Sequence, residues 1–404
     1  MLIVQKYGGS SVAGAARMSN AAQRVAETRR TGCGLVVVLS AQGDTTDDLI
    51  AKALEINPKP PKRELDMLLS TGEQQSVALM SMAVHRLGFN AISLNAMQVG
   101  MTSSSTYGNA RIKHINTERI NAELERNNIV FVTGFQGVNR SNDITTLGRG
   151  GSDTTAVALA AALNADLCEI YTDVDGIFTA DPRIVPTARK INAISYDEML
   201  ELASLGAKVL HNRSVELAKK YNVNLVVRSS LTRNEGTLIK EEVKLEKTLV
   251  SGLALDKDVA RISVVGIKDE PGMAFKLFSI LANEKICVDI ILQSIGRQNT
   301  KDITFTVERS LLDDTIKIIE RNKDILLYDH LSFGDQIAKL SVVGAGMLNN
   351  PGVASIMFEA LFDAGVNIHM ISTSEIKISV LIDERSADKA INYVHDKFAD
   401  YFNA

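Results

Sequence analysis

The chain contains 404 residues, of which 45% are hydrophobic and 23% are charged. At about 150 residues per domain this length allows two or three domains, and the ordinary composition excludes a chain that is disordered throughout. The 44 basic and 48 acidic side chains give a formal net charge of −4 at pH 7. No long basic run occurs, which disfavours nucleic acid or an anionic membrane as the main partner.

The cysteines and the apolar stretches indicate a cytoplasmic protein. Cys33, Cys168 and Cys287 are an odd number, and no CxxC or metal-ligand spacing relates them, as is usual in a reducing compartment. The longest apolar stretch, which contains residues 156–162, is far shorter than the roughly 20 residues of a membrane span. Residues 1–6 lack the features of a signal peptide. We therefore expect a cytoplasmic location.

Strand and helix patterns alternate in the amino-terminal half. Apolar runs typical of strands occupy residues 2–4, 35–39, 129–133 and 168–172, and helical patterns include residues 15–28, 74–86 and 154–165. This alternation predicts an α/β domain in which helices cover a mostly parallel sheet. Most of these strands run into glycine or small polar residues. Ligands of open α/β sheets bind at such carboxyl ends.

A sequence repeat organises the carboxyl-terminal part. ISVVG at 262–266 matches LSVVG at 340–344, and Pro271-Gly272 matches Pro351-Gly352. Each copy indicates a small ferredoxin-like unit, which could be scaffold alone or a ligand module. The expected division is an amino-terminal domain at residues 1–240, a connector with one strand at 241–260, a first repeat at 261–335 and a second repeat at 336–404.

Two glycine-rich turns are candidate anion sites. KYGGSS at 6–11 follows the first predicted strand, and its glycines allow backbone N–H groups to approach an anion, although a Gly-Gly pair also forms plain turns. It is not a Walker loop, because its lysine precedes the glycines. RGGSD at 149–153 precedes a predicted helix. Its arginine can hold a carboxylate with two parallel hydrogen bonds, and its aspartate can orient a lysine.

Acidic residues mark two further candidate sites. TDVDGI at 172–177 closes a predicted strand and DPR follows at 181–183, where the aspartates could equally be turn formers. Glu73, within STGEQ at 70–74, opens the helix predicted at 74–86. At that position it could bind a ligand or only stabilise the amino end of the helix.

Six segments stand out along the chain: KYGGSS at 6–11, SAQGDTTDDL at 40–49, STGEQ at 70–74, GRGGSDTTA at 148–156, TDVDGIFTADPR at 172–183 and GAKVLH at 206–211. In sequence and in order these segments resemble the amino acid kinase family, and within it the aspartate kinases. The two repeats resemble the paired ACT domains of these kinases, so the resemblance covers essentially the whole chain.

The resemblance implies that ATP phosphorylates the β-carboxylate of L-aspartate, on the route to lysine, threonine and methionine. A free aspartate side chain, with a pKa of about 3.9, is already ionised at neutral pH, so no general base is needed. The reaction instead requires charge neutralisation and the alignment of two anions. We expect Mg²⁺ to arrive with ATP, held by phosphate and water, and we expect no metal site built by protein side chains.

The resemblance also assigns roles to residues of this chain. Lys6 would contact the transferring phosphoryl group, Asp153 would orient Lys6, and Lys208 would neutralise ATP phosphates. Arg149 would bind the α-carboxylate of aspartate, and Glu73 would bind its ammonium group. The other residues of the substrate pocket would be Ser40, Thr46 and Ser152. Gly8 and Gly9 would donate N–H bonds to phosphoryl oxygens. The nucleotide site would further include Tyr7, Thr172, Asp173, Phe178 and Arg183.

In ACT pairs an amino acid binds between modules, so the resemblance implies an effector site for lysine, threonine or both. Simple dimer contacts are the alternative. We expect a homo-oligomer, dimer or tetramer, and we expect residues 250–255 to complete the second repeat. The effector residues would be Lys268, Asp269, Gly272, Gln293, Asn367, Ile368, Met370, Thr373, Ser374 and Glu375.

Two other functions compete with this hypothesis. The chain could be another kinase of the family, acting on acetylglutamate, glutamate, carbamate or a nucleotide monophosphate, but GRGGSD together with STGEQ and two ACT-like repeats argues against that. It could also be a catalytically inactive amino-acid sensor. The joint presence of Lys6, Arg149 and Asp153 argues against a sensor.

Overall fold

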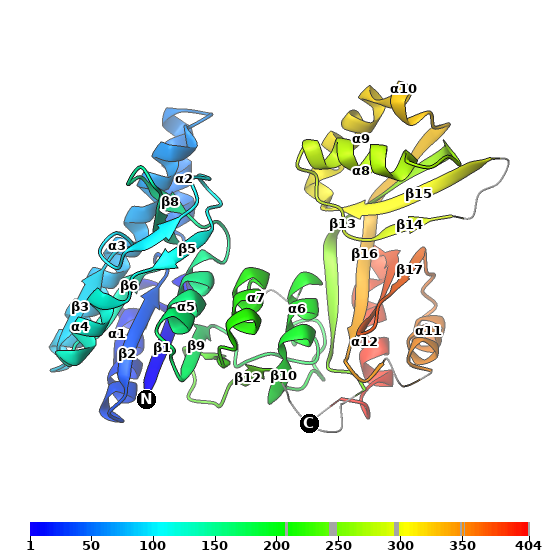
Figure 1. The fold of residues 1–404 in the computed structure, drawn as a ribbon. Helices are drawn as coiled ribbons and strands as arrows, with labels where there is room; N and C mark the ends of the chain where they lie inside the picture. Colours follow the sequence, from blue (N-terminus) through cyan, green and yellow to red (C-terminus); the bar gives the residue numbers. More distant parts are fainter. Residues whose placement is uncertain (207–208, 242–248, 295–298, 348–349, 351, 403–404) are drawn as a thin grey trace.

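The computed structural model describes residues 1–206, 209–241, 249–294, 299–347, 350 and 352–402. In this part of the chain the amino-terminal half forms an eight-stranded sheet, in which only β11 and β12 pair antiparallel (Figure 1). The strands, in their order across the sheet, are β10 (Ala193–Ser195), β12 (Thr237–Lys240), β11 (Leu225–Ser229), β9 (Leu167–Thr172), β1 (Leu2–Tyr7), β2 (Gly34–Leu39), β6 (Ile129–Thr133) and β3 (Ala91–Leu94).

Helices cover both faces of this sheet. Alternate residues of β2 enter two separate apolar cores: Val36 and Val38 pack on one face, and Leu35, Val37 and Leu39 on the other. Strands buried on both faces read as continuous apolar runs, as the VVV of β2 does. The predicted helix-covered parallel sheet is therefore confirmed. The helices are α1 (Gly14–Arg30), α2 (Thr45–Ile56), α3 (Lys62–Arg86), α4 (Glu118–Glu125), α5 (Gly151–Ala162), α6 (Tyr196–Ser204) and α7 (Asn212–Tyr221).

One predicted boundary is wrong. Glu73 does not open a helix but lies in the interior of α3, because residues 62–69 are good helix formers and the helix already begins after Pro61. A role for Glu73 in stabilising a helix amino end is thereby excluded. Beside the helix lies a small sheet of β5 (Ile112–Ile115), β4 (Met101–Ser103), β7 (Gln136–Val138) and β8 (Ile144–Thr146).

The two repeats share a six-stranded sheet of order β14-β15-β13-β16-β18-β17 among the described residues. Two long strands, β13 (Gly252–Lys268) and β16 (His330–Val343), run through both repeats (Figure 1). The other strands are β14 (Ile291–Gln293), β15 (Thr300–Val307), β17 (Met370–Thr373) and β18 (Lys377–Asp383). The helices are α8 (Met273–Asn283), α9 (Leu312–Arg321), α10 (Lys323–Leu326), α11 (Val353–Asp363) and α12 (Ala387–Lys397).

The pairing of β13 with β16 divides each strand between the repeats. Residues 252–256 pair with 339–343, beside β18 of the second repeat, whereas residues 261–265 pair with 330–334 in the first repeat. The register shifts between these two stretches. The first repeat is thus connected on both sides through strands that begin or end in the second.

Glu198 joins the amino-terminal domain to the second repeat. This carboxylate is 8% exposed and lies in the first turn of α6, where Oε2 accepts hydrogen bonds from Ser195 N (3.1 Å) and Ser195 Oγ (2.6 Å). Its Oε1 accepts hydrogen bonds from Ser251 Oγ (2.6 Å) and Ala345 N (3.1 Å). One side chain therefore completes a helix cap and binds two loops at the second repeat, one before β13 and one after β16.

Replacing Glu198 should weaken the fold more than replacing a neighbouring charge. Glu198→Ala leaves several buried donors without an acceptor, so we expect the free energy of unfolding to fall by about 2–4 kcal/mol. Glu201→Ala, which removes only a half-buried ion pair with Lys377, should cost less than about 1 kcal/mol. Denaturant unfolding of both variants checks this, and equal losses would contradict the bridging role.

Candidate active site

The turns that follow the parallel strands meet at one edge of the sheet, namely the edge formed by the carboxyl ends of its strands. Ser40 N–H donates to the carbonyl of Tyr7 (3.1 Å), Gly43 N–H to that of Gly9 (3.1 Å), and Gly134 N–H to that of Leu39 (3.0 Å). These bonds join the loops after β1, β2 and β6. A ligand at this edge is therefore surrounded by loops that are fixed to one another.

Lys6 and Asp153 form the central charged pair of this edge. Lys6 Nζ lies 2.6 Å from Asp153 Oδ1, and the two side chains are only 12% and 11% exposed. Lys6 lies within β1, which runs on to Tyr7, and Asp153 lies in the first turn of α5. The predicted pairing of these residues thus matches the observed contact. It fixes the ammonium group where a strand end meets a helix amino end.

The glycines at this edge allow close backbone packing. A Cβ at Gly9 would lie 2.7 Å from the carbonyl oxygen of Ala41, and one at Gly134 would lie 2.5 Å from Ser152 Oγ. Gly8 N–H already donates to the carbonyl of Tyr171 (3.3 Å). In this arrangement Gly8 therefore has no free N–H for a phosphoryl oxygen, whereas the N–H of Gly9 has no acceptor in the described part of the chain.

Glu73 is a buried carboxylate with one free oxygen. The residue is 3% exposed; Oε1 accepts a hydrogen bond from Ala41 N (3.1 Å), whereas Oε2 has no partner within the described residues. Burial raises the pKa of Glu73 to about 7, partly opposed by the bond from Ala41. An unpaired buried carboxylate is costly, so a cation that enters beside Oε2 would be bound favourably.

The loop that carries Arg149 is held from two sides. Asp66 of α3, 1% exposed, accepts hydrogen bonds from Thr146 N (2.8 Å) and Thr146 Oγ1 (2.7 Å). From α7, Arg213 donates to the carbonyl of Leu147 (2.7 Å). Arg149 itself is exposed and has no hydrogen-bond or ion-pair partner among the described residues. A free guanidinium thus extends from a fixed loop.

The other predicted nucleotide residues lie at the ends of β1 and β9 and in the segment that follows β9. Tyr7 is fully buried and stacks on Tyr171, with 4.5 Å between ring centroids. Thr172 Oγ1 donates to Asp173 Oδ1 (3.0 Å) at the end of β9. Phe178 forms an isolated bridge with Lys190, and Arg183 is 87% exposed and pairs with Asp181 (2.7 Å). No contact in the described part of the chain joins Arg183 to Lys6, and Lys208 lies outside the described residues.

Three hydroxyl groups at this edge escaped the sequence reasoning. Ser11, Thr133 and Ser230 each bury an oxygen that has no partner among the described residues, and each follows or ends a strand of the parallel sheet. Buried polar atoms are normally paired, so these oxygens are candidates for ligand contact. The signal in the sequence is a hydroxyl residue at the end of an apolar run. The predicted Ser40 and Thr46 are half-buried near them, and Ser152 is buried.

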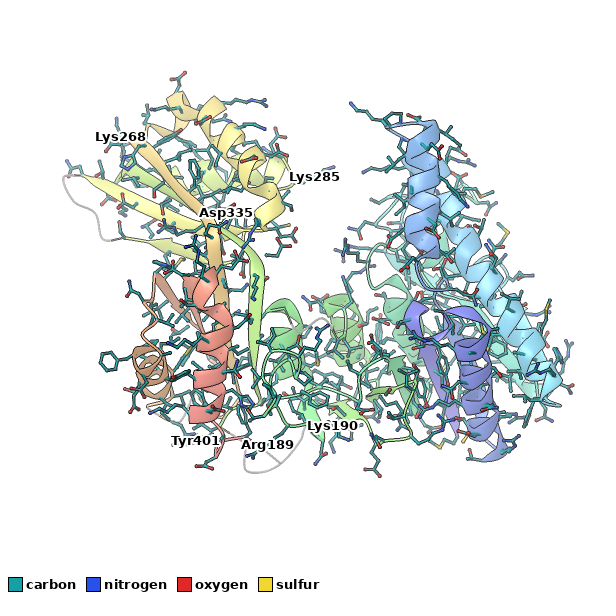
Figure 2. All side chains as sticks on the ribbon, turned by 180° about the vertical axis from the view of Figure 1, so that it is seen from behind. Arg189, Lys190, Lys268, Lys285, Asp335 and Tyr401 are labelled. Carbon is teal, nitrogen blue, oxygen red and sulfur yellow. The ribbon has the colours of Figure 1, made fainter. Side chains whose placement is uncertain are left out.

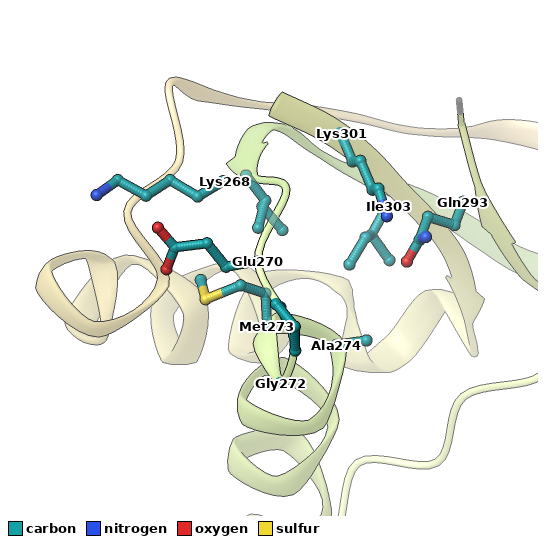
Figure 3. Close-up of a pocket in the computed structure, with 10 residues that line it drawn as sticks. Lys268, Glu270, Gly272, Met273, Ala274, Gln293, Lys301 and Ile303 are labelled. Atoms are coloured by element: carbon teal, nitrogen blue, oxygen red, sulfur yellow. The ribbon is translucent and has the colours of Figure 1, made fainter. Parts of the chain in front are cut away.

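A cavity of about 220 Å³ in the first repeat collects part of the predicted effector set. Lys268, Gly272 and Gln293 line it together with Glu270 and Lys301 (Figure 3). Asp269 lies beside it and pairs with Lys301 at 2.6 Å. The cavity thus offers charges of both signs, as the head group of a free amino acid requires.

A second, more open cavity of about 550 Å³ lies between the repeats. Gln293 borders both cavities, and Ile368 and Met370 of the second repeat line the larger one. The remaining predicted effector residues, Asn367, Thr373, Ser374 and Glu375, are exposed and line neither cavity. Within the single chain, the predicted effector residues are therefore only partly brought together.

Over the ranges that the structure describes, no group of three or more His, Cys, Asp or Glu side chains could hold a metal ion. No described helix combines the length and the apolar character that crossing a bilayer requires. The three cysteines are unpaired.

The raised pKa of Glu73 makes the stability of the ligand-free protein depend on pH. Because the folded pKa lies above the unfolded value, the stabilising contribution is present at low pH and is lost as pH rises from about 4.5 through about 7. Glu73→Gln removes this loss. We expect the free energy of unfolding of the variant, relative to wild type, to rise by up to about 3 kcal/mol between pH 4.5 and 8.5.

The control is Glu123→Gln, which replaces a buried carboxylate paired with Arg119 (2.9 Å) and Arg126 (3.2 Å) and should destabilise at pH 8.5. Denaturant unfolding at both pH values measures the difference. A constant offset between Glu73→Gln and wild type would contradict the shifted pKa.

Comparisons with known proteins agree with this geometry. The profile of the amino acid kinase family matches residues 1–229, and the ACT domain profile matches residues 262–322 and 340–398. The aspartokinase of Bacillus sp. (strain MGA3) is 50% identical over 398 residues, which cover 98% of this chain and 97% of that protein.

Two solved structures of E. coli aspartokinase III resemble the whole chain at 25% identity. The complex with aspartate and ADP (R-state) has a TM-score of 0.85 and covers 99% of this chain and 100% of its own. The complex with lysine and aspartate (T-state) has a TM-score of 0.76 and covers 100% of both chains. This chain belongs to the amino acid kinase family and, within it, to the aspartokinases with two ACT domains.

Proposed function

We propose that this chain transfers the γ-phosphoryl group of ATP to the β-carboxylate of L-aspartate and releases ADP and 4-phospho-L-aspartate. The observation that carries the proposal is the buried Lys6–Asp153 pair beside the turn at Gly9. Relatives at half identity are aspartokinases, and the E. coli R-state complex holds aspartate and ADP. We also propose a reducing cytoplasm as the compartment.

Lys6 is the proposed electrostatic centre of the transfer. The β-carboxylate attacks the γ-phosphorus while the bond to the β-phosphate oxygen breaks, so negative charge accumulates between two anions. An ammonium group held in place beforehand by Asp153 stabilises that charge without moving during the reaction. The N–H of Gly9 adds a donor from the same turn. Lys208 and Mg²⁺ carried by the ATP phosphates would neutralise the rest.

The acceptor site follows from the charges beside Lys6. Glu73 Oε2 would bind the ammonium group of aspartate, and the free Arg149 guanidinium would bind its α-carboxylate through two parallel, bidentate hydrogen bonds. Hydroxyls of Ser40, Thr46 and Ser152 would complete the pocket. On the donor side the nucleotide would lie against Gly8, Thr172, Asp173, Phe178 and Arg183. The side chain of Tyr7 is fully buried and is not available to it.

Lys6→Ala tests the proposed centre. Removal of a contact made mainly in the transition state should lower kcat on the order of a hundredfold or more, with a smaller change in KM for either substrate. Steady-state kinetics with ATP and aspartate measure this. Arg149→Lys is the contrast: it should mainly raise KM for aspartate, because a point charge cannot replace the planar fork.

Two results would contradict these assignments. Unchanged turnover of Lys6→Ala would remove Lys6 from the transfer, and a defect of Arg149→Lys confined to ATP would place that guanidinium on the donor side.

The ACT repeats are the proposed regulatory part. A lysine-bound T-state is known for the E. coli relative, and the cavity at Gln293 presents both charges that an amino acid needs. We propose that lysine, threonine or both bind there and favour a less active arrangement. The exposed Thr373–Glu375 stretch and Asn367 would meet the ligand only in a homo-oligomer, a dimer or tetramer, in which another copy completes the site.

Feedback should be lost without loss of catalysis when the cavity is changed. Gln293→Ala or Asp269→Ala should raise the inhibitor concentration for half-inhibition several-fold, while kcat without inhibitor stays near wild type. The coupling free energy between effector binding and catalysis that these changes reduce is about 1–3 kcal/mol. The control is Gln336→Ala, an exposed glutamine on β16 that lines neither cavity. Titrations with lysine and threonine, singly and together, measure the response. Absence of any response in wild type would reject both effectors.

A further inference from the structure

The segment between β9 and β10 is built into two cores at once. This donor segment, residues 177–190, carries two of the proposed nucleotide residues, Phe178 and Arg183. Its amino end stays with the parallel sheet, where Ile177 packs in the core beneath α5–α7 and its carbonyl accepts a hydrogen bond from Ile191 N (2.8 Å). The middle of the segment packs on a different domain: Ala180 (3% exposed) and Val185 (0%) belong to the apolar core of the second repeat.

His395 of α12 is the polar centre of this junction. The residue is 2% exposed, and its ring touches the donor segment with both nitrogens: Nε2 lies 2.9 Å from Thr179 Oγ1, and Nδ1 lies 3.3 Å from Thr187 Oγ1. The ring also stacks on Phe402, with 4.7 Å between centroids. Two threonines eight positions apart on one segment thus share a single histidine of another domain.

The hydrogen bonds around Thr179 assign the proton of the ring. Thr187 Oγ1 donates its hydrogen to Asp396 Oδ1 (3.4 Å), so towards His395 Nδ1 it can only accept. Thr179 Oγ1 accepts a hydrogen bond from Arg189 N (3.0 Å) and donates its own hydrogen to His395 Nε2. Nδ1 then carries the proton and donates to Thr187 Oγ1. Burial lowers the pKa of His395, with Asp396 opposing and Arg189 adding to this effect, which favours the neutral ring that the pattern requires.

Two further bonds fasten the same segment to the second repeat. Leu253 N–H, at the start of β13, donates to the Thr179 carbonyl (2.6 Å), and Asn392 Nδ2 donates to the Ile184 carbonyl (3.0 Å). Figure 2 shows this junction at the lower end of α12, with Arg189 and Tyr401 labelled there. The donor segment is therefore held by a strand start and a helix face of a domain that contributes nothing to the parallel sheet.

We propose that His395 is a positioning residue for the phosphate donor, supplied by the second repeat, which holds the donor segment through Thr179 and Thr187. The inference rests on the proposed function, because it takes Phe178 and Arg183 as nucleotide contacts. If the donor segment adopts the binding arrangement in only a fraction of the molecules, the apparent affinity for the nucleotide falls in proportion to that fraction. The acceptor residues Glu73 and Arg149 lie on other elements, so aspartate affinity should not change.

The test compares Thr179→Val and His395→Gln with wild type in the full-length chain. Valine keeps the shape of Thr179 but removes both hydrogen bonds of its hydroxyl, whereas glutamine can replace one bond of the ring. We expect Thr179→Val to raise KM for ATP and the dissociation constant of ADP by about three- to tenfold, with kcat and KM for aspartate within about twofold. His395→Gln should fall between Thr179→Val and wild type.

Hydrogen exchange without any ligand gives a readout that does not depend on activity. In Thr179→Val the amides of residues 177–190 should exchange faster, while peptides from β1 and β2 should be unchanged. The control is Thr315→Val in α9 of the first repeat, which also buries its threonine fully but bonds only the Leu311 carbonyl. It should lower stability without changing KM for ATP.

The outcomes separate the inference from the proposed function. Equal changes in KM for ATP and for aspartate, or exchange at 177–190 no faster than in wild type, would overturn the positioning role. A wild-type chain that forms no phosphorylated aspartate would overturn the proposed function, and ADP binding together with exchange would still decide the role of His395.

Discussion

The ion pair of Lys6 with Asp153 is the contact on which the active-site edge depends. Both side chains are almost buried, and a buried charge is costly unless it has a partner. The pair therefore couples the place of β1 in the sheet to the placement of α5. Further contacts connect the loops around this pair: Ser152 packs against Gly134, Gly9 packs against Ala41, and the Ala41 N–H donates to Glu73. Each loop of the site is therefore held in place by a contact with a neighbouring loop.

The proposed acceptor and donor sides of this edge differ in what holds them. The proposed acceptor residues lie on α2, α3, α5 and the loops after β2 and before α5, which belong to the amino-terminal domain, and Asp66 and Arg213 hold the Arg149 loop within that domain. The donor segment instead shares its core with the second repeat. A rearrangement of the repeats would therefore reach the proposed nucleotide residues before the proposed aspartate residues. This asymmetry gives a physical route for an amino acid bound in the repeats to affect phosphoryl transfer.

Sequence reasoning succeeded where a motif is contiguous and follows a strand. The parallel sheet and the turns after β1 and before α5 were accessible from such motifs, whereas the pairing of Lys6 with Asp153 was implied by the resemblance to the amino acid kinases. It failed for the start of the helix that contains Glu73, because residues 62–69 lack a strong apolar period and the helix start was placed too late. It also missed contacts between distant segments. Thr179 and His395 are 216 positions apart. Thr179 lies in the TDVDGIFTADPR segment at 172–183, but nothing in that segment points to His395, so only the packing of α12 on the donor segment shows their relation.

The chemical identity of the product decides whether this chain phosphorylates the β-carboxylate of aspartate. An acyl phosphate reacts with hydroxylamine, so the purified chain is incubated with ATP, Mg²⁺, hydroxylamine and either aspartate or glutamate, and the hydroxamate and ADP are quantified together. We expect the β-hydroxamate of aspartate in equal amount to ADP, and none from glutamate. Formation of ADP without aspartyl hydroxamate, or a preference for glutamate, would contradict it.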